Sequence, residues 1–355
     1  MVPTASGAST ASASSGWIDR PCRNGGSRVH ERGLVVNIAF TSCIDAVDDH
    51  EQEVWTTIAQ HAPDVLVLLG DIMYMDYGLG FLGSQRPVGW PRKVTNDVFA
   101  TTMHERYARQ WSVASFRALL ATGIPLGMTW DDHDFAWNNS RGRGRQKYFA
   151  VSRDKRLIAQ GLFRQFRGAC NDIGLSAYPA MPSLTELLEG PEEGIQARFD
   201  HEDVRFIMID GRSFREDPRI RPDADMLGQP QREWIRQELS GWHGMVVIGS
   251  GSVLTGTGES WAEYSDYEWL LGLHNRQVVV LTGDIHRNVL PVRHSPFLYE
   301  VTSSGAAHPG LGGGLGNFGG ARGNFGILTI GDIVSATLYS PDNPNGASAT
   351  IRFGE

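Results

Sequence analysis

The sequence predicts an α/β fold in which buried parallel strands alternate with helices. Two aliphatic runs, residues 65–71 and 278–284, end in the same Gly-Asp dipeptide. Branched aliphatic side chains suit a strand that is buried on both faces, and a glycine lets the chain turn sharply where the strand ends. Ligands bind in the crevice outside the strand ends of an open α/β sheet. We therefore expect Asp71 and Asp284 to be neighbours in a site that attracts cations.

Short aliphatic runs and amphipathic stretches alternate along the first part of the chain. The runs are typical of strands, and the stretches repeat their apolar residues with the period of a helix. In chain order they predict a strand, a helix, a strand, two helices and a strand, over residues 34–40, 51–60, 64–69, 101–111, 115–121 and 124–128.

The rest of the chain continues this pattern and then changes character. A hairpin, a helix, a strand, a helix and a strand are predicted over residues 196–209, 231–239, 245–248, 267–273 and 278–281. The hairpin is expected to turn at residues 200–203. Antiparallel strands are predicted over residues 328–334, 336–339 and 349–353, with Asn-Pro-Asn-Gly at residues 343–346 as a turn. Residues 75–94 and 305–326 are rich in glycine and are predicted to be loops, either at the rim of a site or simply on the surface.

Residues 1–33 are predicted to be a flexible tail and lead-in to a single domain over residues 34–355. Residues 1–15 are nearly all Ala, Ser, Thr and Gly, without the basic start and apolar stretch of a signal peptide or the long run of a membrane span. A cytoplasmic location follows if the chain has no leader, and a periplasmic or secreted one if a leader is removed.

Composition limits the partners. The 355 residues carry a net charge of −8 without any block of Lys or Arg, which argues against nucleic acid or an anionic membrane surface as the main partner. Cys22, Cys43 and Cys170 are far apart and form no CxxC pair, so neither a disulfide framework nor a zinc knuckle is indicated. The sequence does not indicate an oligomeric state.

Reactive side chains gather where four predicted strands end. These ends bring a thiol, a phenol, two imidazoles and several carboxylates, namely Cys43, Asp71, Tyr74, Asp131, Asp132, His133, Asp134, Asp284 and His286. Ionised acids packed together would repel one another, and most would become protonated. A bound cation removes that conflict.

The ligand types suit two different metals. Cys43, Tyr74 and His286 would hold Fe(III), because a phenol with a pKa of about 10 becomes a ligand at neutral pH only beside a strong Lewis acid. Asp132 and Asp284, with the amide oxygen of Asn138, suit Ca, Mg or Mn. Asp71 could bridge both positions, and paired metals are a common device for in-line attack at phosphorus.

Five motifs, in this order and spacing, resemble the alkaline phosphatase D (PhoD-like) family of metallophosphoesterases. They are Thr41-Ser42-Cys43, Gly70-Asp71-x-x-Tyr74, Trp130-Asp131-Asp132-His133-Asp134 followed by Asn138, Asp210-x-Arg212-x-x-Arg215, and Gly283-Asp284-x-His286. The resemblance covers residues 34–300. Motifs that are confirmed by their context carry more weight than any one of them alone.

The resemblance implies two packed mixed β-sheets flanked by helices, with the metals at the strand ends. It implies that Asp71 bridges the metals, that Tyr74 belongs to the ferric ion and that the second site takes calcium. His133 would contact the phosphoryl oxygens or protonate the leaving group. One departure is that a further metal-binding histidine of the wider superfamily, between Asp132 and Asp284, has no counterpart here.

The expected function is metal-dependent hydrolysis of a small phosphate ester, a monoester and/or a diester, through in-line attack by a metal-bound hydroxide. A phospholipase D-type phosphodiesterase is the alternative. Less favoured are a thiol hydrolase built on Cys43, His133 and Asp132 and a binding protein without catalysis. Asp131 and Asp134 are expected to orient His133 or a metal ligand. Arg212 and Arg215 either grip the phosphate or, as we favour, pair with Asp131 or Asp134 in a structural network.

Overall fold

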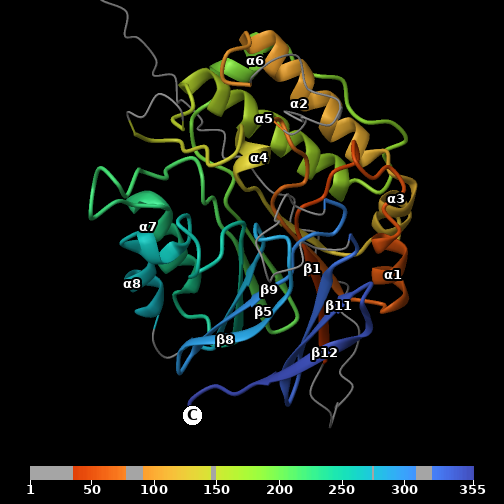
Figure 1. The fold of residues 1–355 in the computed structure, drawn as a ribbon, viewed down its shortest axis with the longest axis vertical. Helices are drawn as coiled ribbons and strands as arrows, with labels where there is room; N and C mark the ends of the chain where they lie inside the picture. The colour runs from red at the N-terminus through yellow and green to blue at the C-terminus, as the bar shows by residue number, and fades with distance from the viewer. Residues whose placement is uncertain (1–34, 77–90, 145–148, 274–275, 309–321) are drawn as a thin grey trace, which may run out of the picture. The chain divides into compact units, whose positions relative to one another are not determined.

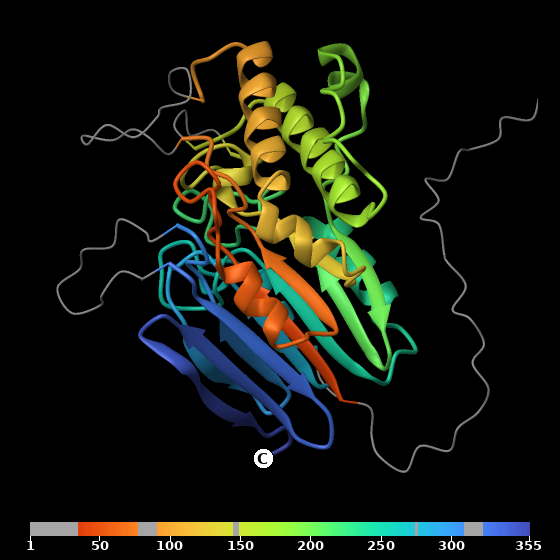
Figure 2. The ribbon, with the colours of Figure 1, turned by 90° about the vertical axis from the view of Figure 1, so that its right-hand side faces the viewer.

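Two six-stranded mixed β-sheets pack face to face, with helices on their outer faces (Figures 1 and 2). The computed structural model describes residues 35–76, 91–144, 149–273, 276–308 and 322–355. These residues belong to one compact unit over Leu34–Glu355. The tail predicted over residues 1–33 lies outside the described residues. Within the described part of the chain, no helix is long and apolar enough to cross a membrane.

The first sheet has the strand order β12-β11-β10-β1-β2-β3. Its parallel half consists of β1 (Val36–Thr41), β2 (Val65–Leu69) and β3 (Leu126–Thr129). Its antiparallel half consists of β10 (Phe325–Ile330), β11 (Val334–Ser340) and β12 (Asn343–Ile351). The parallel strands are almost wholly buried, which is what continuous aliphatic runs require.

The second sheet has the order β4-β5-β6-β7-β9-β8. Four parallel strands form its centre, namely β5 (Val204–Met208), β6 (Met245–Ser250), β7 (Val278–Thr282) and β9 (Leu298–Thr302). The antiparallel strands β4 (Ala197–His201) and β8 (Val289–Ser295) form its edges.

The helices cover the sheets from both sides. Against the first sheet, and beyond its strand ends, pack α1 (Val54–Gln60), α2 (Asn96–Trp111), α3 (Ala114–Leu120), α5 (Arg153–Asn171) and α6 (Leu184–Glu189). Against the second pack α7 (Gly228–Leu239), a 3-10 turn (Trp261–Glu263) and α8 (Asp266–Leu271). The short helix α4 (Asp132–Phe135) directly follows β3.

Three apolar cores hold these layers together. One lies between the two sheets and contains inward-facing residues of both, such as Phe40, Val67, Phe206 and Leu281. The other two lie between each sheet and its helices. The predicted sandwich of two mixed sheets flanked by helices is confirmed.

The C-terminal prediction was partly wrong. The strand expected over residues 328–334 is the end of β10, a turn at residues 331–333 and the first residue of β11. The turn expected at residues 343–346 lies inside β12, and the chain turns at residues 341–342 instead. Pro344 is tolerated because β12 is an edge strand. Gly346 has φ +76°, and a Cβ there would lie 2.5 Å from Thr337, so glycine fits an irregular strand rather than a turn.

Most of the two predicted loops, residues 77–90 and 309–321, lies outside the described residues. Residues 325 and 326 belong to β10 and not to a loop. Six elements of the described part of the chain were not predicted at all: α4, α5, α6, β8, β9 and the 3-10 turn.

Candidate metal centre and active site

The carboxyl ends of β1, β2, β3 and β7 bring the predicted residues to one edge of the paired sheets. Among the described residues, eight that are not glycine have a positive φ, and four of them are predicted ligands: Cys43 (56°), Asp71 (50°), Asp284 (71°) and His286 (50°). Residues other than glycine rarely adopt this left-handed backbone conformation. It costs about 1–3 kcal/mol per residue and is concentrated at functional sites.

The two Gly-Asp dipeptides need their glycines for different reasons. Gly70 has φ +86°, and a Cβ on it would lie 2.5 Å from the backbone nitrogen of Asp131. Gly283 has no positive φ, but a Cβ there would lie 2.5 Å from Ser42 Oγ and 2.8 Å from the Leu69 carbonyl oxygen. The predicted sharp turn therefore explains Gly70, whereas Gly283 allows the ends of β1, β2 and β7 to approach closely.

Asp71 lies at the centre of the acidic cluster. One ligand atom each of Asp71, Asp131 and Asp284 lies within 4.8 Å of the others, and the same holds for Asp71, Asp132 and His133. The expectation that Asp71 and Asp284 are neighbours is confirmed. One carboxylate thus belongs to two groups that could each hold a metal ion.

The electrostatics of this cluster favour a bound cation. Burial raises the pKa of Asp71 well above its ordinary value. Burial, followed by the negative charges of Asp131 and Asp132, raises the pKa of Asp284 to about 7. Asp132 Oδ1 is buried and has no hydrogen-bond partner, although buried carboxylate oxygens are normally satisfied. A metal ion beside these oxygens would supply the missing partner and remove the repulsion.

Cys43 and Tyr74 lie against the same carboxylate. Cys43 Sγ is 3.4 Å from Asp71 Oδ2 and 3.1 Å from Ser304 Oγ, and the Tyr74 hydroxyl is 3.5 Å from Asp71 Oδ2. Both side chains are buried, and burial raises the pKa of Cys43 and holds that of Tyr74 well above its ordinary value. Thiolate and phenolate are therefore unfavourable here unless a strong Lewis acid stabilises them.

His286 is held so that one ring nitrogen is available to a metal. Its Nδ1–H donates to the carbonyl oxygen of His308 at 2.9 Å, and its backbone N–H donates to Ser304 Oγ at 2.9 Å. Burial lowers the pKa of His286, which favours the neutral ring. A neutral imidazole whose other nitrogen donates to a carbonyl is the usual form of a metal ligand.

His133 is paired with a residue that the sequence reasoning missed. Its Nδ1–H donates to Asp76 Oδ1 at 2.6 Å. Burial lowers the pKa of His133, but the neighbouring carboxylates, Asp76 first among them, outweigh burial and hold that pKa well above its ordinary value. Asp76 lies five residues after Asp71 in the same loop, and this spacing was the available signal.

Two further acids shape the loops around the cluster. Both oxygens of Asp131 accept hydrogen bonds from Arg212, from Nε at 2.7 Å and from Nη2 at 2.8 Å. Asp134 accepts four backbone N–H groups, those of Asp71, Ile72, Met73 and Asp131, at 2.6 to 3.2 Å. Asp134 therefore ties the loop after β2 to the short helix α4.

The arginines belong to the framework of the site. Arg212 is fully buried between Asp131 and Glu259. Arg215 is also fully buried, and it donates to the Gly211 carbonyl oxygen and to Ser252 Oγ, both at 2.7 Å. The pairing of Arg212 with Asp131 agrees with the predicted structural network, whereas Arg215 contacts Ser252 and Glu259 in place of the predicted Asp131 or Asp134.

Asn138 lies at the rim of the site and is exposed. Its backbone N–H donates to Asp76 Oδ2 at 2.7 Å, and the next residue, Asn139, donates its N–H to Asp132 Oδ2 at 2.6 Å. The metal-ligand role of the Asn138 amide stays a prediction.

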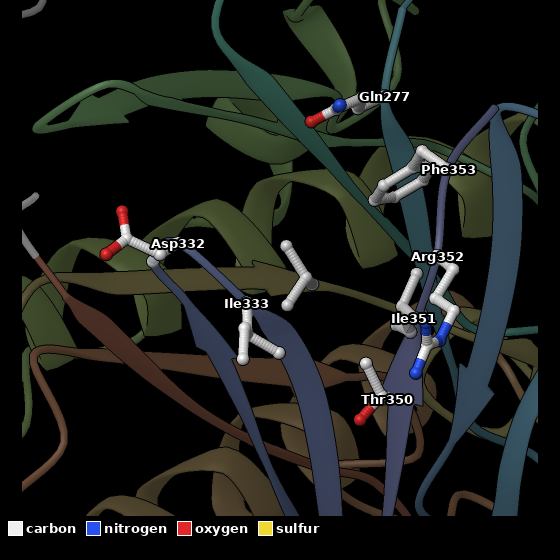
Figure 3. Close-up of a pocket in the computed structure, with 9 residues that line it drawn as sticks. Gln277, Asp332, Ile333, Thr350, Ile351, Arg352 and Phe353 are labelled. Atoms are coloured by element: carbon white, nitrogen blue, oxygen red, sulfur yellow. The ribbon is translucent and has the colours of Figure 1, made fainter.

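A separate cavity of about 360 Å³ lies away from these residues (Figure 3). Gln277, which lines it, precedes β7, whereas Asp284 follows the other end of that strand. The predicted ligands and reactive side chains lie in the strand-end cluster and not in this cavity.

A sandwich of two mixed sheets with acids, histidines and a shared carboxylate at the strand ends defines a metallophosphoesterase. The model of the PhoD-like phosphatase family matches residues 38–257, and the chain belongs to this family. It is therefore a hydrolytic phosphoesterase that depends on metal ions.

Solved structures support the fold. The structure of PhoD shares 20% identity with this chain at a TM-score of 0.58, and the alignment covers 89% of this chain and 68% of PhoD. A dimetal phosphatase from Danio rerio shares 12% identity at a TM-score of 0.53, with 90% of this chain and 99% of that chain covered. No curated protein matches the sequence.

Proposed function

We propose that this chain hydrolyses small phosphate esters, monoesters and/or diesters, at the strand-end cluster, and that residues 34–355 act as one catalytic domain. The observation that carries the proposal is the central position of Asp71: its Oδ2 lies within 3.5 Å of the Cys43 thiol and the Tyr74 hydroxyl, and its carboxylate also lies within 4.8 Å of ligand atoms of Asp132 and Asp284. A carboxylate shared in this way suits a centre with two metal ions, which is the arrangement that favours in-line displacement at phosphorus.

Fe(III) is the metal that we assign to Cys43, Tyr74 and His286, with Asp71 as the bridge. The thiol and phenol lie within 3.5 Å of the same Asp71 oxygen, and soft or phenolic ligands suit a highly charged transition metal. Ca, or Mg or Mn, is assigned to Asp132 and Asp284, with Asn138 completing the oxygen ligands. When bound, these metals would supply a nucleophilic water of lowered pKa and neutralise charge on the phosphoryl oxygens.

His133 serves the leaving group. Asp76 Oδ1 accepts the Nδ1–H of His133 at 2.6 Å, so the ring is held in an orientation that leaves Nε2–H for the substrate. The neighbouring carboxylates keep the imidazolium form favourable. A charged ring can then donate a proton to the departing oxygen or a hydrogen bond to the phosphoryl group.

Asp131 and Asp134 position rather than react. Arg212 occupies both oxygens of Asp131, and four backbone N–H groups occupy those of Asp134. Each acid thereby fixes the loop that carries Asp71 or Asp132, and neither has to bind substrate.

The thiol-hydrolase alternative needs Cys43 and His133 as a hydrogen-bonded pair, and other groups engage both residues. Cys43 Sγ lies against Asp71 and Ser304, whereas His133 is engaged by Asp76. The raised pKa of Cys43 also opposes a free nucleophilic thiolate.

The test is metal analysis of protein purified without chelator, together with rates on an aryl phosphate monoester and an aryl phosphate diester. Asp71→Asn should lose metal and both activities, while the partly exposed Asp200→Asn should keep them. An Asp71→Asn protein that retains metal and activity would overturn the proposal. Absence of iron would remove the Cys43 and Tyr74 assignment alone, and turnover confined to the diester would favour the phospholipase D-type alternative.

A further inference from the structure

A second group of ligands lies outside the residues assigned so far. One ligand atom each of Asp45, Asp48 and His308 lies within 4.8 Å of the others. Asp45 and Asp48 come from the loop after β1, and His308 follows β9. Two segments that are about 260 residues apart in sequence thus bring two carboxylates and one imidazole together.

Asp45 carries the first sign that something is missing from this group. Its side chain is only 1% exposed, and Oδ1 accepts the backbone N–H of Val47 at 2.9 Å. Its other oxygen, Oδ2, is buried without any hydrogen-bond partner. A buried carboxylate oxygen without a partner loses its hydration and gains nothing in return, so it marks a position where an ion or another polar group belongs.

Asp48 and His308 form a hydrogen-bonded pair that an ion could bridge. His308 Nδ1 lies 2.9 Å from Asp48 Oδ2. Tetrahedral zinc with bonds of about 2.0–2.2 Å holds two such ligands about 3.4 Å apart, so binding would require the pair to open by only about 0.5 Å. A cation could therefore replace the proton that these atoms now share. Asp48 is only partly buried and gives the group a route to solvent.

The backbone holds His308 in place before any ion binds. Its N–H donates to the carbonyl oxygen of Cys43 at 3.0 Å, and its own carbonyl oxygen accepts from His286 Nδ1 at 2.9 Å. Its ring lies 4.3 Å, between centroids, from that of Tyr74. His308 is thus fixed by its neighbours and links the group to the proposed dimetal centre through His286 and Tyr74.

The ligand types of the group, rather than an excess of charge, favour a transition-metal ion. Arg106 is buried nearby and its positive charge acts on Asp45 and Asp48. Arg322 donates to the Asp48 carbonyl oxygen at 3.2 Å, so two arginines lie beside the two carboxylates. Two carboxylates and one neutral imidazole suit Zn²⁺ or Mn²⁺ better than a purely oxygen-bound ion.

We propose that Asp45, Asp48 and His308 form a further divalent-cation site, for Zn²⁺ or Mn²⁺, that is distinct from the centre built on Asp71. Through the His308 carbonyl, an ion at this site would steady the His286 ring. The inference does not depend on the substrate or on the reaction at the main centre.

The test removes the main centre and asks whether one site remains. The double variant Asp71→Asn/Asp132→Asn, freed of metal by chelator, is titrated with ZnCl₂ and with MnCl₂ by calorimetry. We expect one ion per chain to bind. Adding His308→Gln or Asp45→Asn should weaken that binding at least about tenfold, because a direct ligand is lost.

His294→Gln is the matched control, since His294 is a buried histidine paired with one carboxylate, Glu300, at 3.1 Å. It should leave the binding unchanged. Should the double variant fail to fold, Asp45→Asn alone in the otherwise intact protein should lower the metal content by one ion per chain. No binding in the double variant, or binding that His308→Gln leaves intact, would overturn the proposal.

Discussion

Replacing Arg212 with methionine should destabilise the protein strongly, because it leaves Asp131 charged and buried. The guanidinium binds both Asp131 oxygens, at 2.7 and 2.8 Å, and neither side chain is more than 1% exposed. Removing one partner of such a buried pair typically costs about 3–5 kcal/mol. We expect the free energy of unfolding, measured by urea titration at pH 7, to fall by that amount.

Arg205 provides a control of matched geometry. It binds both oxygens of Asp200, each at 2.8 Å, but the Asp200 side chain is 27% exposed and also contacts Arg198. Arg205→Met should therefore cost only about 1 kcal/mol. Adding Asp131→Asn to Arg212→Met should recover part of the loss, since the stranded charge is gone. Equal losses in the two single variants would refute the reasoning from burial.

Three other outcomes are expected. Metal-free protein should lose stability as the pH rises from about 4 to 7, because the folded state holds the pKa of Asp284 near 7 and so binds its proton more tightly than the unfolded chain. Metal-loaded protein should not lose stability over this range, and thermal melts of the two forms test the difference. Gly70→Ala should lose about 2–5 kcal/mol in urea unfolding through positive φ and backbone overlap, whereas Gly241→Ala, with a similar φ and open space around it, should lose only about 1–2 kcal/mol. Asp200→Asn should be destabilising at pH 7, and its difference from the parent protein should vanish as the pH falls from about 4 toward 2, because arginine contacts hold the pKa of Asp200 at about 2.

Continuous aliphatic runs made the central strands predictable from sequence, and interrupted runs concealed others. β9 contains Glu300, which is buried because it accepts from the Leu254 N–H, the Thr282 hydroxyl and His294. β8 is an edge strand with Pro291 inside it and an exposed pattern. Both depart from the apolar pattern for reasons that only the neighbouring strands reveal.

Helix α5 was not predicted because polar residues interrupt its apolar pattern. Lys155 and Arg167 lie on its buried face, where their charged groups reach the carbonyl oxygens of Pro91 and Ile195 at 2.6 Å. Long polar side chains that satisfy distant backbone groups break the apolar stripe by which a helix is recognised.

The residues of the site also differ in how well the sequence predicts them. The positions of residues in local motifs, such as Asp71 and His286, could be predicted because parallel strands end at the same edge of a sheet. Asp76 had only its spacing from Asp71 as a signal, and Ser304 and His308 contribute through contacts across loops that no local pattern marks. Their discovery required the fold, because Cys43 and Ser304 meet only where β1 and β9 end on the same edge.

The backbone of the site explains why its metals and its fold should be coupled. Cys43, Asp71, Asp284 and His286 all have left-handed φ values, at a cost of about 1–3 kcal/mol each. Backbone contacts hold this conformation: Asp134 accepts the N–H of Asp71 at 2.6 Å, and the Ser304 hydroxyl accepts that of His286 at 2.9 Å. These contacts fix the ligands but add no positive charge, so the repulsion among the buried acids remains until a cation binds. An ion that binds the folded arrangement of these ligands and not the unfolded chain should therefore raise the stability of the whole domain by mass action.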